Sequence, residues 1–349
     1  MCTSYRFELE EDAAWRAHLS ARGFAVVAGA MTKSEVASAT ALLWRDIDRV
    51  WPPEARADAV KAGGSGARWS SIRLPAHGLT PRLAQSAGAW KVRGAHGVCQ
   101  AFSKVWDCDT EDLITSMDCV AIWRPWGPGS SAKRPRTEGL HLDQNPFSKP
   151  GLETVQGMVP LKRVDARVGG LAVVPGSNSR TEMEKLKTRL PNLEAAGDWC
   201  PLPRNDPGCR GAILVEAEPG DLILWDSRTV HGGMVGRGLS TESDGGAAEG
   251  ADSKTPPHQQ REQEQQQQWY SDVVRLSVTV CMVRRDRASE DALCVRRQGF
   301  LSGRCFNHTP HETGTSTGTI HAPRDPTYVP PELTPEMELL LDGRQQSDD

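Results

Sequence analysis

The hydrophobic and polar positions near the N-terminus alternate between helical and strand-like periods. Helical spacing predicts helices over residues 8–22 and Thr32–Val50, with Thr32 or Ser34 suited to cap the second helix. Between them the apolar run Gly23–Gly29 predicts a strand. Residues 52–90 are rich in Pro, Gly and Ala and poorly periodic. Trp51, just before them, and Trp69 and Trp90 within them are expected to be packing anchors.

Short apolar or alternating runs bounded by turn residues dominate the rest of the chain and predict strands. These runs are Asp118–Trp123, Thr154–Leu161, Gly169–Val174, Leu222–Asp226 and Arg275–Met282. Helical spacing returns only at Arg180–Arg189 and Ala288–Phe300. The pattern therefore indicates a mainly β fold with flanking helices.

Composition sets limits on organisation and location. The 349 residues, 38% of them hydrophobic, suffice for one large domain with helical additions. A net charge of −4 argues against a generic nucleic-acid binder, and no apolar run is long enough for a membrane span. The start MCTSYRFELEEDAAW has no apolar segment typical of a secretory signal. The nine cysteines lack CxxC spacing, which predicts free thiols in a reducing, cytoplasmic compartment.

Residues 238–270 form a polar, Gln-rich, low-complexity segment that interrupts the strand pattern. Such a segment buries too little apolar surface to offset its ordering entropy, so it is expected to be a disordered loop in which His258 is solvated. We therefore expect an N-terminal helical and mixed part over residues 1–117, a catalytic core over 118–310 that carries this insertion, and a mobile tail over 311–349.

The candidate chemistry lies in HLD, residues His141 to Asp143, and in His231 of GDLILWDSRTVHGG. In an extended segment residues i and i+2 point to the same side, so His141 and Asp143 can bind one ion together. Two imidazoles and a carboxylate are the ligand set of non-haem Fe(II) sites. The HxD motif alone is weak evidence, because a hydrogen-bonded His–Asp pair without a metal is the better explanation when the motif stands alone.

The order of the motifs is more specific than any one of them. The segments HLDQNP, GGLAVVPGSNS, GDLILWDSRTVHGG and RLSVTVCM resemble the phytanoyl-CoA dioxygenase-like branch of the Fe(II)/2-oxoglutarate oxygenases, over roughly residues 20–310. This resemblance implies a double-stranded β-helix, or cupin-like jelly roll, with iron in its mouth. The resemblance implies that His141, Asp143 and His231 correspond to the family's metal ligands. It also implies that Arg275 corresponds to the arginine that holds the distal carboxylate of 2-oxoglutarate.

The residue types around Arg275 suit that role, because a guanidinium binds a carboxylate through two parallel hydrogen bonds and keeps its charge when buried. Ser277 shares its face of the strand and adds a donor, and Gln156, on the same face as Met158, is a further candidate for cofactor binding. A solvent-exposed edge-strand arginine is the alternative. Arg228 and Arg237 are rival arginines, and Arg228 has Asp226 as an alternative partner.

The resemblance implies an oxidative reaction that uses Fe(II), 2-oxoglutarate and O2, with ascorbate as a reductant, and that usually hydroxylates its substrate. Related halogenases lack the carboxylate ligand, so Asp143 favours an oxygenase. A small or lipid-like substrate is expected. The basic residues Lys133, Arg134 and Arg136 suit an anionic substrate, but a solvated basic loop is the simpler interpretation. The family name is no evidence for a CoA thioester.

Two other classes of function remain open. One is a catalytically idle jelly roll that binds a metal or ligand, which the presence of His141, Asp143, His231 and Arg275 together disfavours. The other is a cupin-type metal enzyme that uses no 2-oxo acid, which Arg275 and Ser277 disfavour.

Deletion of residues 240–268, with a short Gly/Ser linker in their place, should leave the melting temperature and the 2-oxoglutarate affinity nearly unchanged. The reason is that a solvated loop makes few contacts and its closure entropy varies only slowly with length. Thermal unfolding and ligand titration measure both quantities. A collapse of either would show that the segment belongs to the folded site.

Overall fold

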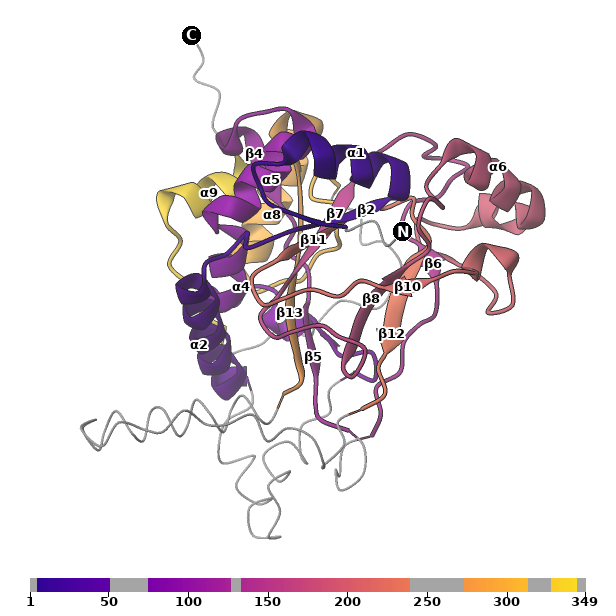
Figure 1. Ribbon diagram of the computed structural model, residues 1–349. Coiled ribbons are helices and arrows are strands. Elements are labelled where there is room, and N and C mark those ends of the chain that lie inside the picture. Colours follow the sequence, from indigo (N-terminus) through magenta and orange to yellow (C-terminus); the bar gives the residue numbers. More distant parts are fainter. Residues whose placement is uncertain (1–4, 51–74, 127–132, 239–272, 313–327, 344–349) are drawn as a thin grey trace.

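The computed structural model describes residues 5–50, 75–126, 133–238, 273–312 and 328–343 (Figure 1). Nearly all of the Gln-rich insertion, together with Trp51 and Trp69, lies outside these residues. Two β-sheets form the centre of the molecule, and helices gather on the outer side of the larger one (Figure 1).

The larger sheet has the strand order β1-β2-β11-β7-β13-β5-β3, and β4 pairs with β13 beside this path. Its strands are β1 (Arg6–Phe7), β2 (Phe24–Val27), β3 (Leu79–Thr80), β4 (Leu113–Thr115), β5 (Val120–Trp123), β7 (Val155–Pro160), β11 (Leu222–Asp226) and β13 (Arg275–Arg284). All of its pairs are antiparallel except β1 with β2.

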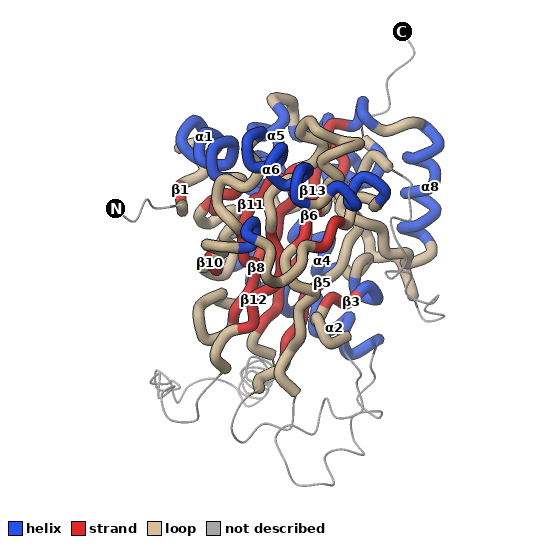
Figure 2. Tube along the Cα trace, turned by 90° about the vertical axis from the view of Figure 1, so that its right-hand side faces the viewer, coloured by secondary structure: helices blue, strands red, loops and turns tan. Residues whose placement is uncertain are grey.

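The smaller sheet has the order β10-β8-β12-β6-β9 and is antiparallel throughout. Its strands are β6 (His141–Leu142), β8 (Gly169–Val173), β9 (Cys200–Pro201), β10 (Ile213–Leu214) and β12 (His231–Val235). Figure 2 turns the molecule so that this sheet faces the viewer. The two facing sheets make the predicted double-stranded β-helix, so the mainly β fold class is confirmed.

The helices are α1 (Asp12–Arg22), α2 (Lys33–Val50), α4 (Ala87–Arg93), α5 (His96–Trp106), α6 (Arg180–Arg189), α8 (Glu290–Leu301) and α9 (Pro335–Asp342). Short 3₁₀ turns occur at Pro81–Leu83, Thr110–Asp112, Pro191–Ala195, Pro207–Cys209 and Arg285–Arg287. Helix α5 was not predicted from the sequence, although its buried Val98, Ala101 and Phe102 have helical spacing. Among the described residues, no helix combines the length and apolar character that a membrane crossing requires.

The alternation of side chains along the strands of the larger sheet separates two cores. On its outer face, Leu276, Val278 and Val280 of β13 pack with the helices in the largest apolar cluster. On its inner face, Met158, Ile223 and Trp225 pack against the smaller sheet. Strand β2 of the N-terminal part also belongs to the larger sheet, so that part supplies a strand of the sandwich as well as helices that cover it.

The expectation of a mobile tail beyond residue 311 is wrong for residues 328–343. Helix α9 buries Met337, Leu340 and Leu341 in the largest apolar cluster. The buried guanidinium of Arg296 donates to the carbonyl oxygens of Leu340 and Leu341 at 3.2 and 3.0 Å. Residues beyond 311 include few apolar side chains, but Met337, Leu340 and Leu341 share one face of α9, and that suffices for burial.

Leu340→Ala should lower the free energy of unfolding by about 2–5 kcal/mol, because it removes a buried side chain and leaves a cavity. Leu339→Ala, at a half-buried position of the same helix, is the matched control and should cost less. Chemical denaturation measures both. Equal, negligible losses would mean that α9 is not docked in solution.

Candidate metal centre

The two candidate histidines face each other across the smaller sheet. Strands β6 and β12 pair antiparallel with His141 opposite His231, although the two residues are far apart in the sequence. Their ring centroids are 4.6 Å apart. Strand pairing therefore brings together two imidazoles that the sequence placed only on separate predicted segments.

Two glycines allow this close approach. A Cβ at Gly232 would lie 2.3 Å from the carbonyl oxygen of Gly139, so a side chain at position 232 would push the HLD segment away from β12. Gly139 itself has a φ of +90°, a conformation that favours glycine. The glycine that follows His231 is thus required by the backbone packing of the site.

Asp143 lies between the two imidazoles. Its Oδ2 is 3.1 Å from Nε2 of His231, and its Oδ1 is 3.5 Å from Nε2 of His141. The three residues each offer one ligand atom, and these atoms lie within 4.8 Å of one another. His231 is buried, whereas His141 and Asp143 are half-buried. The HLD segment thus directs both of its polar side chains toward His231, as its spacing predicts.

Hydrogen bonds orient both imidazoles with Nε2 toward Asp143. Nδ1 of His141 is 3.1 Å from the carbonyl oxygen of Gly139, and Nδ1 of His231 is 2.8 Å from that of Thr229. A carbonyl oxygen only accepts, so each Nδ1 carries the proton and each Nε2 keeps a lone pair. Burial lowers the pKa of His141, which favours the neutral ring that a metal binds.

The Asp143 carboxylate is held by its neighbours. Burial raises its pKa, but the nearby imidazoles of His308, His141 and His231 outweigh burial and hold that pKa well below its usual range. Nε2 of Gln156 donates to Oδ2 of Asp143 at 2.9 Å. In this structure the Gln156 amide orients the carboxylate, and its predicted contact with a cosubstrate stays a prediction.

Arg275 and Ser277 are buried on β13, and each carries a polar atom without a partner among the described residues. The Arg275 guanidinium stacks on Trp123, with Cζ of Arg275 4.3 Å from the centroid of the indole ring. Its Nη2 is 3.4 Å from Sδ of Met158. Neither Nε of Arg275 nor Oγ of Ser277 has a hydrogen-bond partner among the described residues. Burial lowers the pKa of Arg275 to about 10, so the group is charged at neutral pH.

The buried guanidinium therefore lacks a counter-ion, since no carboxylate of the described residues pairs with it. A buried charge without an anion is costly, which makes this position suited to an anionic ligand. Met158, which contacts Arg275, is two residues from Gln156 on the same face of β7, a spacing of about 7 Å. Nε2 of Gln156 in turn donates to Asp143, so β7 contributes contacts both to Arg275 and to the triad.

The rival arginines are engaged elsewhere. Nη2 of Arg228 is 2.7 Å from Oδ2 of Asp226, the pairing that the sequence offered as its alternative role. Arg237 is exposed. In the basic loop, Lys133, Arg134 and Arg136 are exposed, and Arg134 donates to the carbonyl oxygens of Val235 and Gly236, at the opposite end of β12 from His231.

Three residues beside the triad were not singled out from the sequence. Nε2 of His308 is 3.3 Å from the backbone oxygen of Asp143. The rings of Trp199 and Trp225 lie 6.2 and 5.6 Å from those of His141 and His231, and Trp199 is 40% exposed. None of them has a spacing signal, because each reaches the site through the tertiary fold.

Comparison with known proteins agrees with this geometry. Residues 19–237 match the phytanoyl-CoA dioxygenase (PhyH) family, so the chain belongs to that family of Fe(II)/2-oxoglutarate-dependent enzymes. The "Ava biosynthesis cluster protein O" of Aspergillus versicolor is 26% identical in an alignment of 254 positions that covers 66% of this chain. The matched region spans 65% of that relative, just under two thirds of its length.

Two solved structures share the fold. The putative oxidoreductase from Salmonella typhimurium LT2 aligns with a TM-score of 0.55 and 13% identity over 97% of this chain and 86% of that chain. The hypothetical protein JW0805 from Escherichia coli aligns with a TM-score of 0.53 and 12% identity over 89% of this chain and 81% of that one.

Proposed function

We propose that the protein is an Fe(II)- and 2-oxoglutarate-dependent oxygenase that hydroxylates a small or lipid-like molecule. His141, Asp143 and His231 would hold the iron, and Arg275 with Ser277 would bind the distal carboxylate of 2-oxoglutarate. Family membership supports the cofactor requirement in general. The observation that carries the assignment is a buried Arg275 that stacks on Trp123 and has no carboxylate partner among the described residues, in a fold that also holds a His–Asp–His triad.

The donor set fits ferrous iron. Two imidazole nitrogens with lone pairs and one carboxylate leave coordination positions open for a 2-oxo acid and for O2. When bound, the iron and cosubstrate supply the oxidising chemistry. Ascorbate as a reductant belongs to this proposal.

The chain's own contribution is orientation and shielding. Gln156 fixes the Asp143 carboxylate, and the carbonyls of Gly139 and Thr229 fix the two rings. The guanidinium of Arg275 and the hydroxyl of Ser277, both buried with unpartnered atoms, offer charge-assisted hydrogen bonds to a carboxylate. Burial of these donors excludes water, which strengthens their interaction with the anion.

The substrate would enter beside His141. Trp199, 40% exposed and next to His141, offers an apolar ring to a substrate at the iron. The similarity to a protein named for a biosynthesis cluster supports a small-molecule substrate. Asp143 as the third ligand favours oxygen transfer over halogenation.

The proposal as a whole is tested by anaerobic titration of the iron-loaded protein with 2-oxoglutarate. A weak visible charge-transfer band should grow and saturate, because the 2-oxo acid binds the iron directly. If iron binds at the triad and no such band forms, the 2-oxo acid part of the proposal fails and a cupin-type enzyme without this cosubstrate becomes the better explanation.

His141→Ala, Asp143→Ala and His231→Ala should each weaken Fe(II) binding sharply while the fold persists. Loss of a direct ligand should exceed the roughly 10- to 100-fold effect typical of an outer-shell partner. Equilibrium dialysis measures iron affinity, and circular dichroism monitors the fold. If all three variants bind iron like the parent protein, the triad is not the metal site.

Arg275→Lys should weaken 2-oxoglutarate binding by about 2 kcal/mol or more while Fe(II) affinity stays near normal. Lysine keeps the charge but loses the two parallel hydrogen bonds of the guanidinium. Arg228→Lys and Arg237→Lys are the matched controls and should change little. If Arg228→Lys or Arg237→Lys impairs binding and Arg275→Lys does not, the carboxylate-binding arginine has been misassigned.

A further inference from the structure

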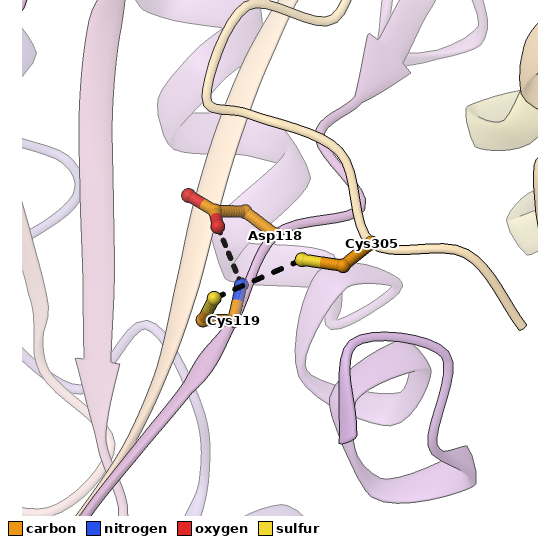
Figure 3. A group of neighbouring side chains, drawn as sticks. All are labelled: Asp118, Cys119 and Cys305. Carbon is orange, nitrogen blue, oxygen red and sulfur yellow. Dashed lines mark hydrogen bonds between the residues drawn. The ribbon is translucent and has the colours of Figure 1, made fainter. Parts of the chain in front are cut away.

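A second group of potential ligands lies apart from the triad, where the chain enters β5. Figure 3 shows Asp118 and Cys119 at this point, and the sulfur of Cys305, from the loop after α8, directed toward that of Cys119. The two Sγ atoms are 3.7 Å apart, and one carboxylate oxygen of Asp118 completes a set of ligand atoms within 4.8 Å of one another. Both cysteines are buried.

We propose that Asp118, Cys119 and Cys305 form a second metal site that takes a thiophilic divalent ion such as Zn²⁺. Two sulfurs bound to one tetrahedral zinc at about 2.3 Å lie about 3.8 Å from each other. The observed Sγ–Sγ separation matches that value and is far longer than the roughly 2.05 Å of a disulfide. The third protein ligand leaves the fourth position for water.

Backbone hydrogen bonds hold both thiols in place. Oγ1 of Thr279 donates to the carbonyl oxygen of Cys119 at 2.6 Å. On either side of Cys305, the Phe306 N–H donates to the carbonyl oxygen of Met117 at 2.8 Å, and Nε2 of Gln85 donates to that of Arg304 at 2.7 Å. The sulfur pair is therefore preorganised by contacts that do not involve the sulfurs.

The charges at the cluster would be balanced if a divalent cation were bound. The guanidinium of Arg93 is fully buried and donates to the carbonyl oxygens of Ala84 and Asp118 at 2.6 and 2.7 Å. Within the described parts of the chain, no carboxylate forms an ion pair with it. Two thiolates and a carboxylate carry three negative charges, and a divalent ion together with this guanidinium cancels them.

The proposed site would join the start of β5 to the loop after α8, which also carries His308 beside the His141–Asp143–His231 triad. Cys305 lies three residues before His308, which contacts the backbone of Asp143. An ion that joins Cys305 to the start of β5 would fix this loop, and with it the position of His308 beside the triad.

Cobalt(II) tests the proposal on the full-length, reduced chain, because thiolate-to-cobalt charge transfer is absent from a site of histidine and carboxylate. We expect this near-ultraviolet band in the parent protein and in the His141→Ala/His231→Ala double variant. It should be lost in Cys119→Ser and Cys305→Ser, with one fewer cobalt bound per chain. Cys281→Ser, at another buried thiol, is the matched control and should keep the band.

Survival of the band in both Cys119→Ser and Cys305→Ser, or its absence from the parent protein, would overturn the proposal. A second measurement needs no variant: X-ray absorption on the parent chain loaded with zinc at both sites should show an average of one sulfur per zinc. Absence of sulfur there would leave a thiol–thiol hydrogen bond as the explanation. A Cys119–Cys305 disulfide that persists in metal-treated protein would also overturn the site.

Discussion

The arrangement of the site depends on the pairing of two short strands, β6 and β12, that sets His141 opposite His231. The pairing is close because Gly232 leaves room for the carbonyl of Gly139, which in turn accepts the Nδ1 proton of His141. One backbone contact thus determines the separation of the imidazoles and the orientation of one of them. Asp143 reaches the same side of the strand because it lies two residues after His141, and the Gln156 amide then orients its carboxylate.

Two of the three buried arginines of the described residues, Arg275 and Arg93, lie beside the two candidate ligand sites. Each guanidinium lies in the interior without a carboxylate partner among the described residues, and burial lowers the pKa of each to about 10. Arg275 stacks on Trp123, whereas Nη1 and Nη2 of Arg93 donate to the backbone carbonyls of Ala84 and Asp118, beside the Cys119–Cys305 pair. In our proposals each provides positive charge for a ligand set, a 2-oxo acid in one case and a thiolate site in the other.

The helices serve the site indirectly, by covering the outer face of the larger sheet. Helices α2, α4 and α5 bury the outward side chains of its strands, and that burial keeps the inner side chains, such as Gln156 and Arg275, in register toward the smaller sheet. The C-terminal helix α9 completes this cover, and the Arg296 guanidinium holds it by donating hydrogen bonds to the carbonyl oxygens of Leu340 and Leu341.

The sequence by itself determined the class of fold and the positions of the main strands along the chain, because strand periodicity is a local property. The order of its motifs likewise indicated the candidates His141, Asp143, His231 and Arg275. The sequence did not reveal His308, the Cys119–Cys305 pair or the docking of α9, since each depends on contacts between segments distant in sequence. Only the tertiary structure decided that Arg228 pairs with Asp226 and that Arg275 has no carboxylate partner among the described residues. Local spacing specifies which face a side chain takes, but only packing decides what lies opposite that face.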